Sequence, residues 1–155
     1  MDNNHIQGSA KGSHYYGLLH NNELVAVMVF VYYNNEYTLT RFATSCHVPG
    51  AFSKLLKAFE REYNSPRIVS FADLRWSRGD MYYINGFTLD CTIRPDYYYT
   101  KGRQIDRFHK FGFRHKLMKS KLEVYDSSLS EEENMTANGF YRIWDCGKLK
   151  FVKNK

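Results

Sequence analysis

The chain has 155 residues and a formal net charge of +6; 43% of the residues are hydrophobic, 25% are charged and 17% are aromatic. This length and composition suit one domain with a normal core and exclude a disordered chain. The longest apolar run, residues 24–33, is shorter than the roughly 18 residues that cross a membrane, and it indicates a buried strand. Three widely spaced cysteines, without a Cys-x-x-Cys pair or a signal sequence, favour a reducing cytoplasm.

The first three predicted elements are strands. Residues 15–19 and 23–33 are predicted strands joined at Asn21-Asn22, because Asn tolerates the positive φ of a tight turn. Asn34-Asn35 makes a second turn into residues 37–43, whose side chains alternate between two faces. We therefore expect an antiparallel meander.

Residues 52–63 show the clearest helical pattern. One apolar stripe follows the spacing i, i+3, i+4, i+7 and i+11, and consists of Phe52, Leu55, Leu56, Phe59 and Tyr63. Asn64-Ser65-Pro66 ends this helix, and residues 67–72 form the next strand. A strand, a loop with glycine, a helix and a strand make a βαβ unit, so the two strands should be parallel neighbours.

Shorter elements follow in the second half of the chain. Strands are predicted at residues 87–92 and 97–99, and the basic segment 101–121 is of mixed structure. Ser130 begins a capping box ahead of a short helix. Residues 141–144 and 148–152 are predicted to form a terminal hairpin.

The pattern as a whole predicts an α+β fold. It has a mixed, mainly antiparallel twisted sheet, a central βαβ unit and flanking helices. We find neither repeats nor a linker, so residues 1–155 are expected to form a single domain.

One motif lies inside the βαβ unit and a second motif follows it. With the meander, Gly50 at the helix start and Tyr82-x-x-x-Gly86-Phe87 resemble the Gcn5-related N-acetyltransferase (GNAT) family. The resemblance implies that the loop before the helix offers backbone N–H groups to the pyrophosphate of acetyl-CoA, and that Tyr82 is the acid for the leaving thiolate. The cofactor-binding residues so implied are Val48, Gly50, Ala51 and Ser53.

The loop departs from the family's usual Gln/Arg-x-x-Gly-x-Gly/Ala. Ser45 and Val48 stand at its first two slots, and only Gly50 fits. Pro49 also lacks an N–H that could serve a phosphate.

Ordered motifs along almost the whole chain carry a second resemblance. They are His5-Ile6-Gln7-Gly8, Tyr16-Gly17-Leu18-Leu19 through Glu23-Leu24-Val25 and Met28, Arg41-Phe42, Gly50-Ala51-x-Ser53-Lys54-Leu55, Ala72-Asp73-x-Arg75-Trp76-Ser77-x-Gly79, Tyr82-x-x-x-Gly86-Phe87, Pro95-x-Tyr97-x-Tyr99 and Arg142-Ile143-x-Asp145-Cys146-Gly147. In this order they look like the C-terminal domain of phage homing-endonuclease-like proteins of the Vsr-like type. The resemblance implies an accessory domain without the nuclease, and without the first strand and helix of the relatives, in the host cytoplasm. The sheet edge that this absence exposes would then be covered by a second copy in a homodimer or by a partner chain.

Residues after the strand at 67–72 are the candidates for chemistry. Asp73 with His5 can form a general base pair, and Tyr82 can act as a general acid. Substrate-binding candidates are Gln7, Arg75, Trp76 and Ser77. In the alternative interpretation, Asp73 and Arg75 form a structural ion pair with Trp76 packed below. We predict no metal site, because the histidines and carboxylates show no ligand spacing.

The positive charge is concentrated between residues 94 and 122. This segment contains nine Lys and Arg residues but only two acidic residues, Asp96 and Asp106. Such a block favours nucleic acid as a partner, and the alternative is a solvated basic face. The candidate contacts are Tyr97, Tyr99, Arg103, Arg107, Lys110, Arg114 and Lys116. The first functional hypothesis is thus a nucleic-acid-binding accessory domain that does not cleave alone. The alternative is a GNAT-type acyltransferase that uses acetyl-CoA on a small-molecule or macromolecular amine.

Overall fold

The computed structural model describes residues 3–63, 67–102 and 106–154. The chain divides into two compact units. Unit 1 comprises Met1–Ile93 and Lys148–Lys155, and unit 2 comprises Arg94–Gly147. Unit 2 is therefore an insertion into unit 1. The single domain expected from the sequence stays a prediction, because it depends on whether the two units unfold together.

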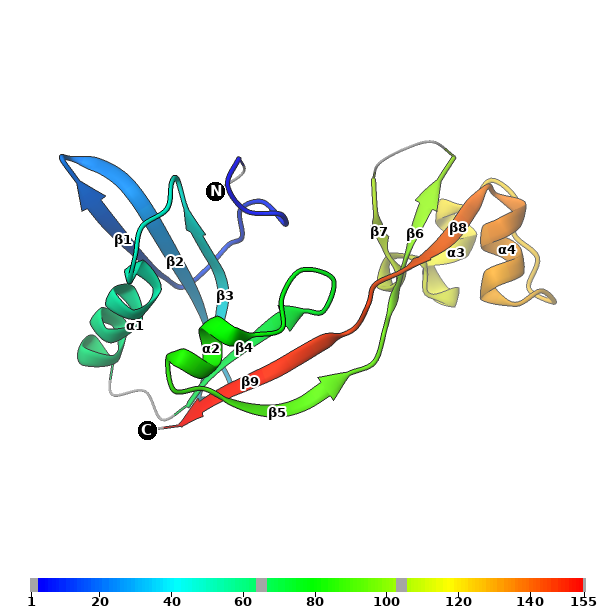
Figure 1. The fold of residues 1–155 in the computed structure, drawn as a ribbon. Coiled ribbons are helices and arrows are strands. Elements are labelled where there is room, and N and C mark those ends of the chain that lie inside the picture. Colours follow the sequence, from blue (N-terminus) through cyan, green and yellow to red (C-terminus); the bar gives the residue numbers. More distant parts are fainter. Residues whose placement is uncertain (1–2, 64–66, 103–105, 155) are drawn as a thin grey trace. The chain divides into compact units, whose positions relative to one another are not determined.

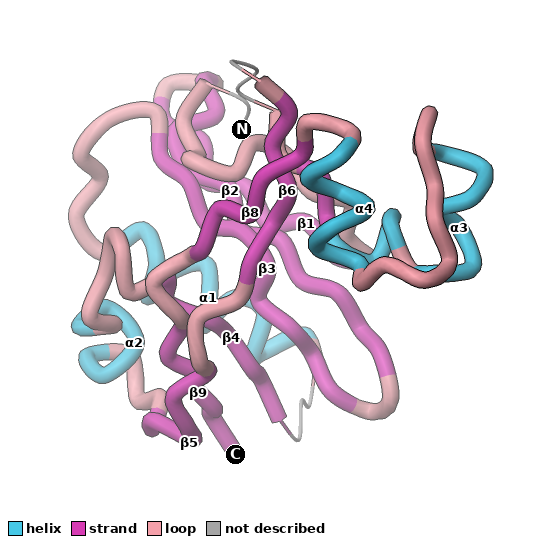
Figure 2. The backbone as a smooth tube through the Cα atoms, turned by 90° about the vertical axis from the view of Figure 1, so that its right-hand side faces the viewer, coloured by secondary structure: helices cyan, strands magenta, loops and turns pink. Residues whose placement is uncertain are grey.

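Unit 1 is built on a six-stranded sheet in the order β1-β2-β3-β4-β9-β5 (Figures 1 and 2). Its strands are β1 (His14–His20), β2 (Glu23–Tyr33), β3 (Glu36–Thr44), β4 (Arg67–Asp73), β5 (Thr88–Ile93) and β9 (Lys148–Asn154). All neighbours are antiparallel except β3 and β4, which are parallel and joined through helix α1 (Ala51–Glu62). This confirms the predicted meander, the βαβ unit and the α+β fold class. The tight turns have positive φ at Asn21-Asn22 and Asn34-Asn35, as predicted.

The main core lies between this sheet and two helices, α1 and α2 (Asp80–Ile84). Alternation along β2 turns Met28 and Phe30 toward the helices. Phe30 stacks on Phe59 of the α1 stripe, with ring centroids 3.8 Å apart. From α2, Tyr82 packs on the same core. The predicted end of α1 at Asn64-Ser65-Pro66 lies outside the described residues.

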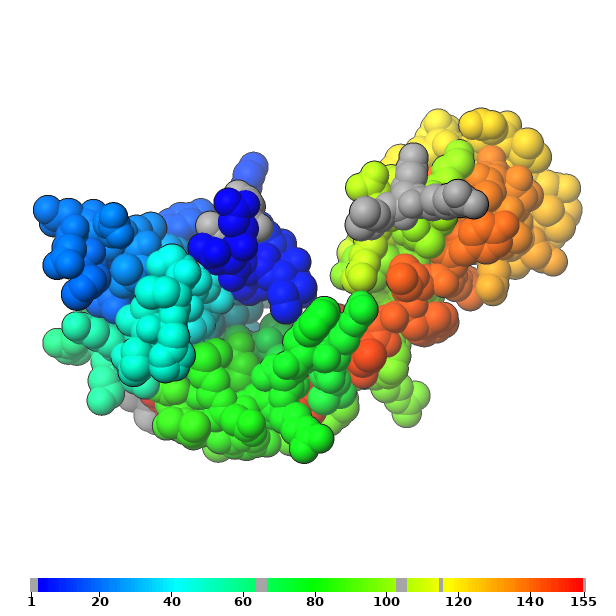
Figure 3. Space-filling view, turned by 45° about the horizontal axis from the view of Figure 1, so that its top comes forward, coloured from blue at the N-terminus to red at the C-terminus, as the bar shows by residue number. Residues whose placement is uncertain are grey.

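The N-terminal segment, residues 3–13, packs on the six-stranded sheet, where Gly12 contacts strand β2 (Figure 3, dark blue). Gly12 lies against Val29, which alternation places on the face opposite Phe30. A Cβ on Gly12 would lie 2.2 Å from Val29 Cγ1, so the backbone approach requires glycine there. Arg41 Nε also donates to the carbonyl oxygen of Gly8 (3.1 Å).

Unit 2 has its own three-stranded sheet, in the order β7-β6-β8. Its elements are β6 (Tyr97–Lys101), β7 (Phe108–His109), the 3-10 helix η1 (Lys110–Phe113), α3 (His115–Lys121), α4 (Glu131–Ala137) and β8 (Phe140–Trp144). A separate core fills the space between this sheet and its helices: Tyr99, Phe113, Met118, Leu122, Met135 and Phe140. The capping box predicted at Ser130 is confirmed, since Ser130 and Glu133 bond each other's backbone N–H.

The predicted C-terminal hairpin is wrong. β8 pairs with β6 inside unit 2, whereas β9 pairs with β4 and β5 inside unit 1. Each strand instead pairs with a strand from an earlier part of the chain. Asp145-Cys146-Gly147 is therefore a passage between units. No helix in the described ranges is long and apolar enough to cross a membrane.

Candidate functional site

The parallel strands β3 and β4 pair only over their first residues. Their register consists of Tyr37 with Ile68 and Thr38 with Val69. Beyond these positions the described parts of the two strands run apart, as Figure 1 shows. In open α/β sheets, ligands commonly bind where neighbouring strands part at their carboxyl ends. The carboxyl-terminal parts of β3 and β4 therefore form the candidate site.

Ser70 stands at the point where the strands part. It is 1% exposed, and its Oγ lies 2.9 Å from the carbonyl oxygen of Leu39 on β3 and 2.8 Å from the Tyr82 hydroxyl. The Tyr82 hydroxyl in turn lies 3.4 Å from the carbonyl oxygen of Phe71. When Ser70 donates its single hydrogen to Tyr82, Tyr82 is left to donate to Phe71. The sequence analysis missed Ser70; a polar residue inside the apolar run of β4 was the available signal.

The Tyr82 ring is fixed by aromatic neighbours. It lies 4.9 Å from Phe151, 5.4 Å from Phe87 and 5.9 Å from Phe52, measured between ring centroids. Burial raises the pKa of Tyr82, and the hydrogen bond from Ser70 offsets part of that rise. Tyr82 therefore keeps its proton at neutral pH and is placed to hold it at a defined position.

The N-terminus of α1 is uncapped by any side chain. Gly50 is its N-cap residue, with φ 72, and an added Cβ there would meet nothing within 4 Å. The first turn holds no acidic residue. The N–H of Ala51 bonds to the carbonyl of Val48 (3.2 Å), whereas those of Phe52 and Ser53 belong to the helix positions that lack an intrahelical partner. An anion fits such a terminus.

The cofactor-binding candidates surround this terminus in two different ways. Val48 and Ala51 pack their side chains on the core, so only their backbone groups can serve a ligand. The Ser53 hydroxyl donates to Asn85 Oδ1 (2.5 Å) and so links α1 to the end of α2.

The predicted general base pair of His5 and Asp73 is not formed among the described contacts. His5 Nδ1 accepts the N–H of Gln7 (3.1 Å), and partial burial, followed by the positive charge of Arg41, lowers the His5 pKa. Asp73 Oδ1 accepts the N–H of Arg75 (2.9 Å), which closes the turn after β4. Each group thus has its own local role here, and a joint catalytic role stays a prediction.

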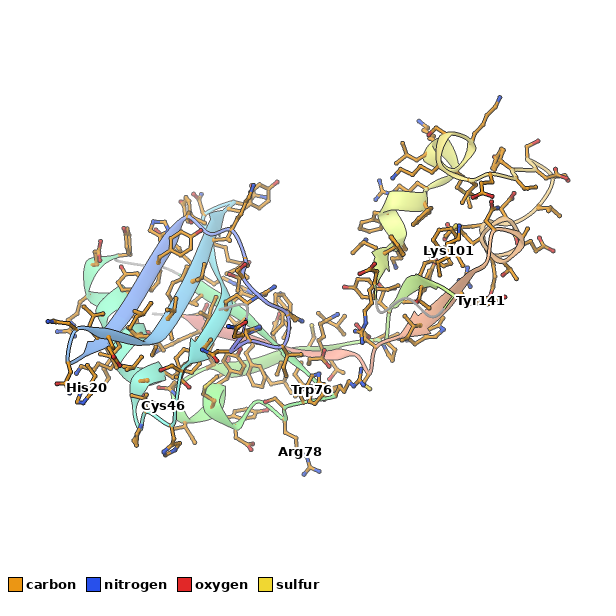
Figure 4. All side chains as sticks on the ribbon, turned by 90° about the horizontal axis from the view of Figure 1, so that it is seen from above. His20, Cys46, Trp76, Arg78, Lys101 and Tyr141 are labelled. Atoms are coloured by element: carbon orange, nitrogen blue, oxygen red, sulfur yellow. The ribbon has the colours of Figure 1, made fainter. Side chains whose placement is uncertain are left out.

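The alternative ion pair of Asp73 and Arg75 is wrong for the described structure. The Arg75 guanidinium lies instead over the Trp76 ring, 5.1 Å from its centroid. Trp76 is 59% exposed rather than packed below, and Figure 4 shows it on the loop after β4 with Arg78 nearby. The Ser77 Oγ accepts the N–H of Gly79 (3.0 Å) and shapes the entry to α2. Arg75, Trp76 and Ser77 lie on one loop, which keeps them as substrate-binding candidates.

The candidate nucleic-acid contacts of the basic segment belong to unit 2, and their side chains differ in how exposed they are. Tyr99 is 1% exposed in the core, with its hydroxyl donating to Glu131, so its ring cannot stack on a ligand. Tyr97 is half-buried, and Lys110 forms an ion pair with Asp96 at 2.5 Å. Arg107, Arg114 and Lys116 are exposed. Arg103 lies outside the described residues.

Metal binding finds no support in the part of the chain that the structure describes. There, no three His, Cys, Asp or Glu residues gather closely enough to hold an ion.

Solved acetyltransferases share this arrangement of strands and helices. An acetyltransferase from Bacillus subtilis in complex with CoA matches at a TM-score of 0.53 and 12% identity, over 91% of this chain and 76% of that one. The chain has a GNAT-like fold. A GNAT family acetyltransferase from Elizabethkingia anophelis with acetyl-CoA bound gives 0.52 and 12%, over 91% and 75%. The IAA acetyltransferase from Bacillus cereus gives 0.51 and 13%, over 91% and 77%. No family model matches the sequence, and no curated protein matches it.

Proposed function

We propose that the protein is a GNAT-type acyltransferase that uses acetyl-CoA to acylate an amine, on a small molecule or a macromolecule. The observation that carries the proposal is the separation of β3 and β4. The protonated hydroxyl of Tyr82 lies beside Ser70, where the strands separate, and the uncapped N-terminus of α1 follows β3. The GNAT-like fold supports it, since three solved proteins of that fold are acetyltransferases and two of them hold CoA or acetyl-CoA.

The residues of the chain have separate tasks in this proposal. Acetyl-CoA, when bound, supplies an acetyl group activated as a thioester. The free N–H groups of Phe52 and Ser53 bind its pyrophosphate, aided by the positive end of the helix dipole. Tyr82 holds a proton at its hydroxyl for the thiolate that leaves. Ser70 holds that hydroxyl in position.

Gly50 offers a direct test of the phosphate site. Gly50→Asp places a carboxylate at the N-terminus of α1, and Gly50→Asn is its uncharged match in shape. Both residue types tolerate positive φ and both cap helices, so neither change should unfold the protein. We expect Gly50→Asp to weaken binding of CoA and acetyl-CoA by about tenfold or more relative to Gly50→Asn, measured by calorimetry.

Thermal denaturation gives a second readout on the same proteins. Acetyl-CoA at about a hundredfold excess over its Kd stabilises the folded state by about 2.7 kcal/mol. Wild-type protein should show this shift, and Gly50→Asp should lose it. Equal binding by the two Gly50 variants would remove the pyrophosphate site from α1. Wild-type protein that binds neither CoA nor acetyl-CoA would overturn the proposal.

The likeness to the accessory domain of phage Vsr-like homing-endonuclease proteins stays a prediction. It concerns the origin of the chain rather than the chemistry of unit 1, and the comparisons with known proteins give it no support. Nucleic-acid binding, which it also implied, is a property that unit 2 would have to supply.

A further inference from the structure

The sheet of unit 2 has one face that its helices do not cover. Alternation along β6 turns Tyr97 and Tyr99 toward the helices and Tyr98 the other way. Across the sheet, Tyr98 is paired with His109 of β7 and with Ile143 of β8. These three residues therefore form one row across the three strands.

Aromatic side chains extend this row. The Tyr98 and His109 ring centroids lie 5.4 Å apart, and those of His109 and Phe111 lie 4.8 Å apart. On β8, Tyr141 lies two residues from Ile143 and so on the same face. Phe111 is 54% exposed, Tyr141 56% and Ile143 39%. We call this set, Tyr98, His109, Phe111, Tyr141 and Ile143, the aromatic face.

The aromatic face is held in a fixed shape. His109 Nδ1 accepts the N–H of Phe111 (3.2 Å), which orients the imidazole and caps η1. The rings are carried by strands and by this short helix. A surface that is ordered before binding loses less entropy when a ligand lies on it.

Uncompensated positive charge borders the aromatic face. The Arg114 guanidinium lies 4.2 Å from the centroid of the Phe111 ring. Arg107 is exposed and stands two residues before His109. Within the described residues, neither arginine forms an ion pair with a carboxylate.

The other aromatic group of unit 2 differs in this respect. Tyr97 and Trp144 lie beside Lys110 and Arg142. Lys110 is paired with Asp96, and Arg142 with Glu132 at 2.7 Å. Lys110 also lies 5.7 Å from the centroid of the Phe111 ring, but the protein itself neutralises Lys110 and Arg142, whereas Arg107 and Arg114 remain available to a polyanion.

We propose that the aromatic face binds single-stranded nucleic acid. Bases stack on the exposed rings, and phosphates contact Arg107 and Arg114. Every base presents a flat π-face to an aromatic ring, but only an unpaired base can leave its neighbours to do so. The charge of the bordering arginines complements the phosphate backbone. This inference concerns unit 2 alone and does not rest on the acyltransferase proposal.

The test measures binding of labelled oligo(dT), oligo(rU) and a duplex by fluorescence anisotropy at several salt concentrations. Phe111→Leu and Tyr141→Leu keep an apolar side chain and remove the ring, and each should weaken single-strand binding by about 5- to 150-fold. Tyr33→Leu is the matched control, because Tyr33 is a 72% exposed ring in unit 1. The dT and rU strands decide between DNA and RNA as the source of the ligand.

The charge arm uses Arg107→Gln with Arg114→Gln. Loss of two phosphate contacts should make the slope of log K against log salt shallower by about 1.4. Lys57→Gln with Arg61→Gln removes the same charge from exposed positions of α1 and should leave the slope unchanged. Circular dichroism confirms that each variant is folded.

Three results would overturn the proposal. One is the absence of single-strand binding at low salt. Another is binding that favours the duplex and ignores the Phe111 and Tyr141 changes, which would make it electrostatic only. The third is a dimer, detected by light scattering, that Tyr141→Leu dissociates, in a protein that binds no oligonucleotide. That result would assign the face to a second copy of the chain.

Discussion

The hydroxyl of Tyr82 combines burial, a fixed ring and a serine partner. As the proposed acid, it must be protonated to act, so activity should fall only as pH rises through its pKa. Because burial raises that pKa, the midpoint of the fall should lie above the ordinary tyrosine value of about 10. We expect Tyr82→Phe to lower kcat by about 10²- to 10⁴-fold and to leave acetyl-CoA affinity unchanged.

Tyr83→Phe is the control for this change. Tyr83 is a 49% exposed neighbour whose ring contacts Phe151, and phenylalanine preserves that contact. Its kcat and pH profile should match those of the wild type. A Tyr82→Phe protein with full activity would show that solvent, and not Tyr82, protonates the leaving group.

Asn134 makes a second residue-scale prediction, on stability. It is 1% exposed, its Oδ1 accepts the N–H of Asp126, and its Nδ2 lies within hydrogen-bond distance of the carbonyls of Asp126, Leu129 and Ser130. Asn134→Ala removes these hydrogen bonds of a buried side chain, so it should lower the free energy of unfolding of unit 2 by about 2–3 kcal/mol. Urea denaturation measures the change. Exposed Thr136→Ala, on the same helix, should stay within about 0.5 kcal/mol of the wild type.

At the scale of single residues, the sequence motif pointed to Tyr82 but did not predict which groups its side chain contacts. Tyr82 was recognised because a spaced motif surrounds it. Ser70 was missed, because its partner Leu39 lies on another strand and no local pattern joins them. Likewise Tyr98, between two predicted contacts, is on the open face while Tyr99 is in the core. Alternation along β6 places Tyr98 and Tyr99 on opposite faces, but the packing of the helices decides which of these faces is buried.

Among the elements, α2 depends on a glycine at its start. Gly79 has φ 86, and an added Cβ would lie 2.2 Å from the Phe151 ring. Gly79→Ala therefore adds a steric clash to backbone strain, and we expect it to destabilise the protein by about 2–5 kcal/mol in urea denaturation.

Gly86, just after α2, allows the cost of backbone strain to be measured separately from the cost of the steric clash. Its φ is 80, but an added Cβ would meet only Lys153 Cε at 3.6 Å, an ordinary contact. Gly86→Ala should therefore show the backbone term alone, about 1–3 kcal/mol. Equal effects at Gly79 and Gly86 would mean that Phe151 moves aside at little cost.

Local periodicity predicted the elements of unit 1 well. The residues that make up the α1 stripe are close to one another in sequence, and so are those of each Asn turn, so the pattern that specifies each element is short-range. The hairpin of β8 and β9 failed for the opposite reason. Both strands are real, but their partners are distant in the chain, and adjacency in sequence was a poor guide to pairing.

For the whole molecule, the attachment of unit 2 predicts that unit 1 folds without it. β5 and β9 are antiparallel neighbours, and Ile93 is directly paired with Lys148. Replacing Arg94–Gly147 by Asn-Gly joins these residues with a two-residue hairpin turn. We expect the shortened protein to unfold cooperatively and, on the proposed function, to bind acetyl-CoA as the full chain does. A shortened chain without a cooperative transition would instead support a single interdependent domain.

The pairing of Ile93 with Lys148 also makes the inserted segment transferable. Its two ends leave the host sheet from neighbouring positions, and inside unit 2 they are joined again, since Asp145 N–H donates to the Asp96 carbonyl and Asp96 N–H to Asp145 Oδ1. A segment with its ends so close occupies the place of an ordinary hairpin loop. An unrelated protein with an exposed hairpin offers the same attachment point, so unit 2 could be grafted there as a cassette, carrying its aromatic face to a new host.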